Sequence, residues 1–482
     1  MRINWEIILI FLYVLIVGIT AIRIILENKN PLKTHSYLLI IIVLPVVGLL
    51  VYYFFGVNLR KEKIFVTKEK IDQAFIQDYM KAYQAGLDLH RAEIEDRLQG
   101  KVRLPFLFFN NSRSVFTLNN RIDFLHGGEM KFPVLLDDLE KATRHIHMEY
   151  YIFNGEDDIG KKIIEILCRK AKAGVEVRLL VDSFGSKISG RLVNKLNEAS
   201  VQIAFFRPLW SPKYFTKSNY RDHRKIVVID GKSGFVGGIN VADYYINTPQ
   251  TKKYWADLHC RIEGDAVFAL QLLFFLNWRF ATEKEFSPLP DYLPPHEVNS
   301  NIPISIMGSN ASGRSPAIMD AYFSMINTAV KEVLITTPYF IPNEAILKSI
   351  LVTAKSGVEV KILLPKVSDG YMVQMACLSY VEQLLENNVH VFLYKKGMIH
   401  SKYMVVDEEV STLGTTNVDE RSFNINAEVN AFIFNKEKSL ELKRQFEADL
   451  LLSEEINLET WNQRSGFRKL QESVFRMVAP LL

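Results

Sequence analysis

Two short stretches of the chain carry residue types that could do covalent chemistry. His-Arg-Lys-Ile-Val-Val-Ile-Asp occupies residues 223–230, and His-Ser-Lys-Tyr-Met-Val-Val-Asp occupies residues 400–407. In each copy a histidine and a lysine lie two residues apart within an apolar run, so on a β-strand both side chains project from one face. Each copy therefore predicts a potential nucleophile beside a cation. The two pairs are His223 with Lys225 and His400 with Lys402.

An aspartate ends each copy, Asp230 in the first and Asp407 in the second. Both belong to the repeated stretch, and we include them in the candidate catalytic set. Each has the opposite strand parity to its histidine, and the dipeptide Asp230-Gly231 is typical of a tight hairpin turn. We therefore interpret both aspartates as mainly structural.

An asparagine follows each histidine at the same interval, because Asn240 and Asn417 each lie 17 residues further along the chain. Each asparagine ends a short turn that contains glycine. Two lysines and two asparagines that converge suit a phosphodiester, whose transition state spreads negative charge over oxygens that preorganised donors stabilise. The pattern predicts a phosphoryl substrate, handled without a metal ion.

The paired histidines predict a transfer in two steps. One imidazole can attack phosphorus while the other, protonated, assists the departing alcohol, and the roles reverse when an acceptor alcohol attacks the phosphohistidine. The attacking ring needs its second nitrogen held as a donor, usually by a carboxylate. Asp257 and Glu428 are the candidates, since each opens a similar strand after its lobe's asparagine. Sequence symmetry does not distinguish the two histidines.

The paired motif resembles that of the phospholipase D superfamily, often called HKD, over nearly everything after about residue 105. The flanking Arg-Asp-His-Arg-Lys and Gly-Thr-Thr-Asn-Val-Asp-Glu-Arg-Ser-Phe are similar to bacterial cardiolipin synthases. This resemblance supports Asp257 and Glu428 as the orienting pair, and favours His223 as nucleophile with His400 as general acid. It implies transfer from one phosphatidylglycerol to another, giving cardiolipin and glycerol through a phosphatidyl-histidine, with no cofactor and no nucleotide.

Other functions are compatible with parts of this pattern. A membrane-bound phospholipase D hydrolase would use water as acceptor, and a phosphatidylserine-type synthase would use a nucleotide-activated lipid as donor. A nuclease would need an electropositive channel with stacking aromatics, which the balance of 58 basic against 54 acidic residues disfavours. A membrane scaffold with an inactive site is disfavoured because each expected His, Lys and Asn is present twice. We expect phospholipid partners and no nucleic acid, and make no prediction of oligomeric state.

The composition predicts two domain cores and no bound metal. A chain of 482 residues with 48% hydrophobic content can bury two ordinary cores. Three widely spaced cysteines in apolar surroundings are typical of buried thiols in a reducing compartment. The sequence contains no Cys-x-x-Cys pair, His-Glu-x-x-His motif or Walker-type glycine loop. The cysteines are Cys168, Cys260 and Cys377.

An internal duplication predicts two α/β lobes. Residues 146–181 have the pattern of a strand, a helix and a second strand, which is a βαβ unit with parallel pairing, and the same unit recurs at residues 333–364. We expect two duplicated phospholipase D-like lobes, at residues 106–286 and 300–482, with mixed, largely parallel sheets flanked by helices. A proline-rich linker at residues 287–299 separates them.

Two apolar stretches near the N-terminus predict a two-helix transmembrane hairpin within residues 1–59, with spans at about 4–26 and 36–57. A cleaved signal peptide is the competing interpretation of the first stretch. Residues 60–105 carry apolar positions at helical spacing and predict an amphipathic linker. Basic residues cluster after the second span, so the positive-inside bias predicts a multi-pass protein of the cell membrane with cytoplasmic lobes.

A few further residues are candidates for the walls of the site. Aromatic residues at corresponding strand ends could line it, although aromatics in strands are expected mainly in the core. Two polar residues after the second asparagine could contact a head group. These candidates are Tyr150, Tyr151, Tyr339 and Phe340, and then Arg421 and Ser422.

Two apolar segments predict helices outside the motifs. Residues 266–280 are almost continuously apolar but short for a membrane span, so we expect a buried helix at the junction of the lobes. Residues 467–478 carry apolar side chains on one helical face. That helix could touch anionic lipid, but we expect it to pack on its own lobe.

Overall fold

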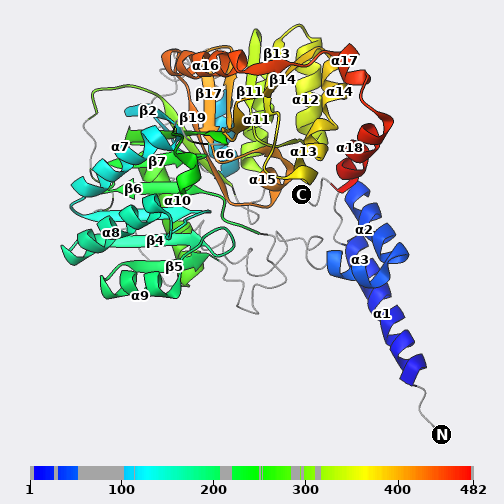
Figure 1. Ribbon diagram of the computed structural model, residues 1–482, viewed down its shortest axis with the longest axis horizontal. Helices are drawn as coiled ribbons and strands as arrows, with labels where there is room; N and C mark the ends of the chain where they lie inside the picture. The colour runs from blue at the N-terminus through cyan, green and yellow to red at the C-terminus, as the bar shows by residue number, and fades with distance from the viewer. Residues whose placement is uncertain are drawn as a thin grey trace.

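The computed structural model describes residues 5–26, 31–52, 103–112, 114–206, 220–248, 251, 253–283, 292, 294, 298–309 and 316–478. Most of the predicted amphipathic linker and of the proline-rich linker lies outside these residues. The described part contains two large β-sheets that share an apolar core, with helices packed around them (Figure 1). Each sheet contains one copy of the repeated motif.

The first sheet has seven strands in the order β2-β9-β7-β6-β3-β4-β5. The helix α8 (Asp158–Lys172) connects β3 to β4, and α9 (Gly190–Glu198) lies between β4 and β5. The strands are β2 (Asn120–His126), β3 (His145–Tyr150), β4 (Glu176–Asp182), β5 (Gln202–Phe206), β6 (Lys225–Ile229), β7 (Ser233–Gly237) and β9 (Leu258–Gly264).

The second sheet has nine strands in the order β1-β10-β19-β17-β16-β11-β13-β14-β20. Without its two edge strands, β1 and β20, this order corresponds strand by strand to the order of the first sheet. The duplication is therefore visible in the topology as well as in the motifs. The strands are β1 (Phe116–Thr117), β10 (Ile304–Ser309), β11 (Glu332–Thr336), β13 (Glu359–Pro365), β14 (Val389–Tyr394), β16 (Tyr403–Val406), β17 (Val410–Gly414), β19 (Glu428–Ile433) and β20 (Ser453–Glu455).

The sheets are mixed, but the expectation that they are largely parallel is wrong. In the first sheet only β3, β4 and β5 pair in parallel, and the other neighbours pair antiparallel. Parallel pairing requires a long crossover, whereas a tight turn imposes antiparallel pairing. The predicted hairpin turn at Asp230 and Gly231 is confirmed, with φ of 54° and 65°. Asp407 and Glu408, with φ of 55° and 61°, form the matching turn between β16 and β17.

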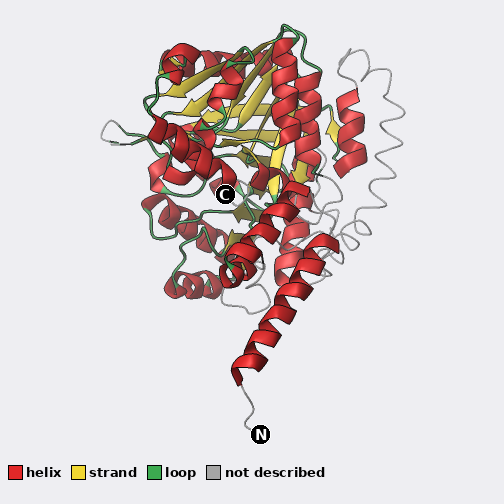
Figure 2. Cartoon of the chain, turned by 90° about the vertical axis from the view of Figure 1, so that its right-hand side faces the viewer, coloured by secondary structure: helices red, strands yellow, loops and turns green. Residues whose placement is uncertain are grey.

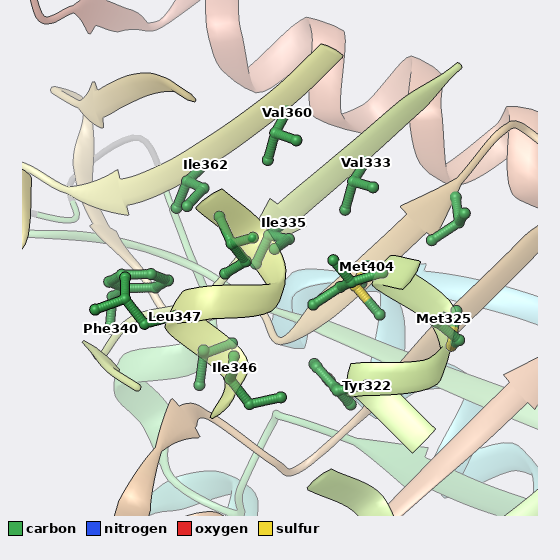
Figure 3. Close-up of a cluster of buried hydrophobic side chains, with 14 of the residues drawn as sticks. Tyr322, Met325, Val333, Ile335, Phe340, Ile346, Leu347, Val360, Ile362 and Met404 are labelled. Carbon is green, nitrogen blue, oxygen red and sulfur yellow. The ribbon is translucent and has the colours of Figure 1, made fainter. Parts of the chain in front are cut away.

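Helices cover the outer faces of both sheets because their apolar residues recur at helical spacing. Ile159, Ile163 and Leu167 of α8 are one turn apart and all buried. Figure 3 shows the core of the second lobe, where Val333 and Ile335 lie in one cluster of buried side chains with Ile346 and Leu347. The other helices of the lobes are α7 (Gly127–Lys141), α11 (Ala317–Asn327), α12 (Glu344–Lys355), α13 (Tyr371–Leu378), α14 (Val381–Leu385), α15 (Glu420–Asn424), α16 (Lys436–Leu451) and α17 (Leu458–Asn462).

The start of the first lobe differs from the predicted boundary at residue 106. Helix α6 (Arg103–Ser112) buries Leu104 and Phe108 in the core of the second lobe. The ring of Phe108 lies 4.6 Å from that of Phe432, centroid to centroid. Strand β1 then pairs antiparallel with β10 at the edge of the second sheet. Residues 103–117 therefore belong structurally to the second lobe, and the first sheet begins at β2.

The helix predicted at the junction of the lobes is confirmed as α10 (Val267–Thr282). Its residues Phe274 and Trp278 are buried in a cluster that also contains Ala427 of the second lobe. A larger apolar core joins the sheets directly, since it includes Val228 of β6 and Val405 of β16. The two lobes are thus held together by a continuous apolar interface, which fixes the geometry between them.

The C-terminal helix α18 (Gly466–Val478) packs on its own lobe, as expected, but through only part of its apolar face. Phe475 contacts the second core, and its ring lies 6.0 Å from that of Tyr371 in α13. Phe467, Leu470 and Met477 are 70%, 60% and 81% exposed. An apolar strip of α18 is therefore left uncovered by the described residues.

The N-terminal helices differ from the predicted pair of continuous spans. Helix α1 (Trp5–Leu26) extends away from the sheets (Figures 1 and 2), and the second apolar stretch forms two helices, α2 (Pro31–Val43) and α3 (Pro45–Val51). The break lies at Leu44, with φ −131° and ψ 73°, because a residue before proline disfavours the helical conformation. Among the described residues, none of the helices combines the length and apolarity needed to cross a membrane. The two-span hairpin stays unconfirmed.

Candidate functional site

One cavity of about 460 Å³ between the lobes is lined by residues of both motifs. His223 lies just before β6 and His400 just before β16. Both of these strands run antiparallel to a central strand, β3 or β11. The two histidines therefore lie at the edge where the parallel strands have their carboxyl ends, a position that favours ligand binding in α/β folds. Asn240 and Asn417 line the same cavity.

The His223 ring is oriented by a carboxylate from the opposite lobe. Nδ1 of His223 lies 3.0 Å from Oε2 of Glu428, which opens β19. Thr415 Oγ1 donates to the same oxygen at 2.5 Å, so the carboxylate is fixed on both sides. Burial raises the pKa of Glu428, but His223, Lys225 and Thr415 more than offset this and hold it below its usual value. A carboxylate anion therefore faces the ring nitrogen and leaves Nε2 available.

The His400 ring has the reciprocal arrangement. Its Nδ1 lies 2.7 Å from Oδ2 of Asp257, which belongs to the first lobe. Lys402 Nζ lies 2.9 Å from the same ring nitrogen. Gly238 runs so close to Asp257 that an added Cβ would lie 2.1 Å from Oδ1. The glycine of the turn before Asn240 is therefore needed to make room for the orienting carboxylate.

Backbone hydrogen bonds between the lobes hold both histidines in register. His223 N–H donates to the carbonyl of Ala427 at 2.9 Å, and His400 N–H donates to that of Ala256 at 2.6 Å. The second contact continues a short parallel ladder between the two lobes. Each histidine is therefore aligned beside the carboxylate that follows Ala427 or Ala256. The ladder joins β8 (Tyr254–Ala256) to β15 (Gly397–Ile399).

Burial favours the neutral form of both imidazoles. The pKa of His223 is lowered to about 4 by burial, although Glu428 opposes the shift. Burial and the charge of Lys402 lower the pKa of His400 below its ordinary value. A neutral His223 has a free lone pair for attack on phosphorus. A bound anionic phosphodiester would raise the pKa of His400 and favour its protonation.

The two lysines are buried cations beside the histidines. Lys225 Nζ donates to the His223 carbonyl at 2.5 Å, and Lys402 Nζ donates to the His400 carbonyl. Burial lowers the pKa of Lys225 to about 7 and that of Lys402 to about 8. Their charges are therefore sensitive to pH in the neutral range.

Comparisons with known proteins agree with this geometry. A family model described as "Cardiolipin synthase, PLD-like domain" matches residues 135–248 and 322–450. The cardiolipin synthase of Clostridium perfringens strain SM101 is 37% identical over 465 residues, which is 95% of this chain and 96% of the relative. The major cardiolipin synthase of Bacillus subtilis strain 168 is 35% identical over 480 residues, or 99% of each chain.

The chain belongs to the cardiolipin synthase family. The family model and the relatives confirm the resemblance to cardiolipin synthases and to the phospholipase D superfamily that the two motifs indicated. Among solved structures, a phosphatidylserine synthase of Haemophilus influenzae superposes with a TM-score of 0.59 over 79% of this chain and 99% of that one. It is 15% identical in sequence, so it shows a shared fold alone.

In this family member the two motif aspartates lie outside the cavity. Asp230 accepts hydrogen bonds from the backbone N–H groups of Thr143, Arg144 and His145, at the entry to β3. Asp407 accepts from the backbone at the entry to β11. Burial raises the pKa of Asp230, but these donors more than offset it and hold the pKa low. Both aspartates fix the start of a central strand, which agrees with a structural role.

The two asparagines are not equivalent. Asn240 Nδ2 donates to Tyr245 Oη at 2.8 Å, and its Oδ1 accepts from the backbone N–H of Ile152 at 3.1 Å. Asn417 Oδ1 is buried and has no hydrogen-bond partner among the described residues. The Asn240 side chain is thus occupied with structural contacts, whereas Asn417 retains an open polar atom.

The aromatic candidates divide by strand parity. Tyr151 and Tyr339 line the cavity, whereas Tyr150 and Phe340 are fully buried in the cores. Adjacent residues of an extended segment point to opposite sides. In each pair of neighbours, one aromatic side chain therefore points into the core and the other points to the cavity. Arg421 and Ser422 both line the cavity. The expectation that all four aromatics lie mainly in the core is therefore right for two of them.

Several cavity residues carried no signal that singled them out in the sequence. They lie in loops, in the short strands β8 and β18 (Val418–Asp419) or in a 3-10 turn (Asp243–Tyr245), and only the fold brings them to the histidines. In the part of the chain that the structure describes, no group of three or more His, Cys, Asp or Glu side chains is placed to hold a metal ion. The additional cavity residues include Arg221, Tyr244, Tyr245, Trp255, Asp369, Asp419 and Asn426.

Proposed function

We propose that this chain is a cardiolipin synthase that transfers a phosphatidyl group from one phosphatidylglycerol to another, giving cardiolipin and glycerol. The observation that carries the proposal is the exchanged pairing of His223 with Glu428 and His400 with Asp257 around one cavity. Two imidazoles, each oriented by the other lobe, suit attack on a single phosphorus and its reversal. The near-complete match to curated cardiolipin synthases supports the choice of lipid.

In the first step His223 acts as the nucleophile. With Nδ1 held by Glu428, the Nε2 lone pair attacks the phosphorus of phosphatidylglycerol and forms a P–N bond. The P–O bond to the head-group glycerol breaks, and His400 transfers its proton to that oxygen. General acid assistance of this kind contributes about 10² to 10⁴ in rate.

In the second step the roles reverse. His400, now neutral, accepts the proton from the terminal hydroxyl of a second phosphatidylglycerol. The oxygen attacks phosphorus, the P–N bond to His223 breaks, and cardiolipin is formed. One phosphodiester is exchanged for another, so the transfer needs no nucleotide. Lys225, Lys402 and Asn417 stabilise the charge that spreads over the phosphoryl oxygens, while Asn240 orients the cavity wall through Ile152 and Tyr245.

The two lobes act as one unit in this proposal. Each lobe supplies one histidine but lacks the carboxylate that orients it, because Glu428 and Asp257 lie in the opposite lobes. Neither lobe, expressed alone, is expected to transfer phosphatidyl groups. We propose a first lobe that ends near residue 286 and a second lobe whose main part starts near residue 300, with the linker between them and with α6 and β1 added to the second lobe.

The test is product analysis with the purified chain in detergent micelles. Phosphatidylglycerol is supplied as the one lipid, without nucleotide, and EDTA is added in a parallel sample. We expect cardiolipin and glycerol in equal amounts in both samples, and no turnover with His223→Ala or His400→Ala. Predominant phosphatidic acid would instead indicate a hydrolase, and a requirement for a nucleotide-activated lipid would indicate a different phosphatidyltransferase.

The proposal includes contact with a lipid bilayer, at which the substrates reside. Helix α1 leaves most of its apolar side chains exposed, among them Phe11 at 67%, and the strip on α18 is exposed as well. Large exposed apolar surfaces of this kind mark interaction sites. The basic residues after residue 59 favour cytoplasmic lobes. The lipid substrates and the exposed apolar surfaces of α1 and α18 therefore support a location at the cell membrane.

The contact through α18 can be tested in the full chain. Leu470→Glu is expected to slow turnover of phosphatidylglycerol in vesicles, and to leave turnover of a short-chain, monomeric phosphatidylglycerol unchanged. Val330→Glu is the control, because Val330 is 75% exposed and lies before β11, at the opposite strand end from the cavity. Equal vesicle rates for the Leu470 and Val330 variants would exclude this contact.

A further inference from the structure

The cavity has two chemically different halves. Around His223, the ring of Tyr151 lies 4.9 Å away, centroid to centroid, and Arg221 and Arg421 line the wall. Around His400 the neighbouring rings are those of Trp255 at 5.6 Å and Tyr339 at 6.4 Å. The first half is cationic, and the second is aromatic and contains a carboxylate, that of Asp369.

Asp369 is held in place although it lies in a loop. The loop joins β13 to α13, and both carboxylate oxygens of Asp369 lie 2.8 Å from the hydroxyl of Tyr339, which donates to them. Ser368 Oγ donates to Oδ1 at 3.1 Å. The residue is otherwise exposed, so free acceptor positions of the carboxylate face the cavity.

A carboxylate is an unexpected group in a cavity for a phosphodiester. Two like charges repel, so Asp369 opposes binding of the phosphate itself. An ionised carboxylate offers only acceptors, and its partner must bring donors. The groups of phosphatidylglycerol that can donate are the free hydroxyls of its head-group glycerol. The charge of Asp369 therefore suits the alcohol portion of the substrate and not its phosphate.

The direction of the displacement places that alcohol in the same half. In phosphoryl transfer the attacking and leaving groups lie roughly in line across phosphorus. With His223 attacking, the leaving oxygen lies on the side of His400, which protonates it. The ring of Tyr339 borders His400, and Asp369 is bonded to Tyr339. The glycerol that leaves, and the one that later attacks, both pass beside Asp369.

We propose that Asp369, held by Tyr339, forms a subsite for a polyol, in which its carboxylate accepts hydrogen bonds from the free hydroxyls of the glycerol head group. The inference rests on the proposed function and extends it to the choice of alcohol. The subsite positions the reacting oxygen at His400 and discriminates against acceptors that lack a second hydroxyl. Water and simple alcohols lose the contact and react more slowly.

The test measures how one covalent intermediate is divided between two acceptors. The purified full chain receives phosphatidylglycerol with equal concentrations of labelled glycerol and 1-propanol. Both alcohols compete for the same phosphatidyl-enzyme, so the product ratio is independent of how fast that intermediate forms. We expect the unaltered chain to favour glycerol, and Asp369→Ala to lower the glycerol to propanol ratio about tenfold, as loss of a hydrogen bond to a charged group predicts.

Two further variants complete the design. Tyr339→Phe removes the hydroxyl that holds Asp369 and is expected to lower the ratio in the same direction, which covers the case in which Asp369→Ala is inactive. Asp158→Ala is the control, because the Asp158 side chain is 84% exposed and lies outside the cavity. The inference is overturned if active Asp369 and Tyr339 variants keep the original ratio. If the unaltered chain makes no cardiolipin, the proposed function fails instead.

Discussion

His223 and Glu428 form a hydrogen bond of 3.0 Å although they are 205 residues apart in the chain and belong to different lobes. The same exchange joins His400 to Asp257. The repeated lobes are thus not two copies of one site, because each supplies a reactive ring and the carboxylate that orients the ring of its partner lobe. This arrangement explains how the two copies of a duplicated fold can share one cavity.

Removing the charge of Glu428 tests the orienting role. Glu428→Gln keeps the size of the side chain but removes the anion that fixes and stabilises the His223 ring. We expect kcat to fall by at least about a hundredfold, as for other carboxylates that orient a catalytic histidine. Steady-state assays in micelles, with the melting temperature as control, check this. A fall of less than threefold in a folded variant would contradict the role.

Arg224 is expected to position the Glu428 strand. Its Nε donates to the Glu428 carbonyl at 3.1 Å, a second nitrogen donates to the Ser309 carbonyl at 3.0 Å, and Glu149 lies 3.9 Å away. Arg224→Met leaves a buried carboxylate without its cation, which costs about 3 to 5 kcal/mol. Thermal unfolding should show a lower melting temperature, together with reduced activity.

The second motif supplies the matched control for Arg224. Ser401 occupies the equivalent position between His400 and Lys402, and has no side-chain bond to the other lobe among the described residues. Ser401→Ala should change melting temperature and rate only slightly. Equal effects of the two substitutions would show that Arg224 has no special role at the interface.

The pH dependence of kcat/KM should be bell-shaped. Protonation of His223, whose pKa is about 4, removes the nucleophile on the acid side. As the pH rises, His400, whose pKa is lowered by burial and by Lys402, loses the proton that it must give to the leaving oxygen. Lys225 and Lys402, with pKa values of about 7 and 8, then lose their charges, so binding of the anionic substrate weakens as well. Initial rates in uncharged micelles would measure the profile. Activity that is constant up to pH 10 would contradict both the acid role of His400 and the lowered pKa values of the lysines.

Gly238 should not tolerate even a methyl group. An alanine Cβ at this position would lie 2.1 Å from Asp257 Oδ1, so the carboxylate must move away from His400. We expect Gly238→Ala to lower kcat about a hundredfold or more, because His400 loses its orientation for proton transfer in both steps. Gly190→Ala is the control, since a Cβ there would have no neighbour within 4 Å. Similar rates for both variants would contradict the account.

The local repeat was sufficient to predict matching positions for the histidines, lysines and asparagines, because the two copies have equal spacing and lie at equivalent strands of the two lobes; their catalytic roles stay predictions. The structural interpretation of Asp230 and Asp407 followed from strand parity and agrees with their backbone contacts. Asp369 could not be found in this way, since nothing in its loop repeats. Its relevance depends on a hydrogen bond to Tyr339 that only the fold creates.

The remaining differences have physical causes as well. Strand β1 has two residues, too few for any periodicity, so its place in the second sheet was not predictable. Leu44 interrupts the second apolar stretch because Pro45 follows it, a local effect that hydropathy does not record. The exchange of carboxylates depends on how the lobes pack, which sequence spacing within a lobe does not determine.

The most direct measurement is the identification of the residue that carries the phosphatidyl group. The purified chain is mixed with phosphatidylglycerol labelled at phosphorus, quenched during turnover, and mapped by mass spectrometry. The account predicts label on His223 in the unaltered chain, and none in His223→Ala. Label on His400, or on a residue outside the cavity, would contradict it.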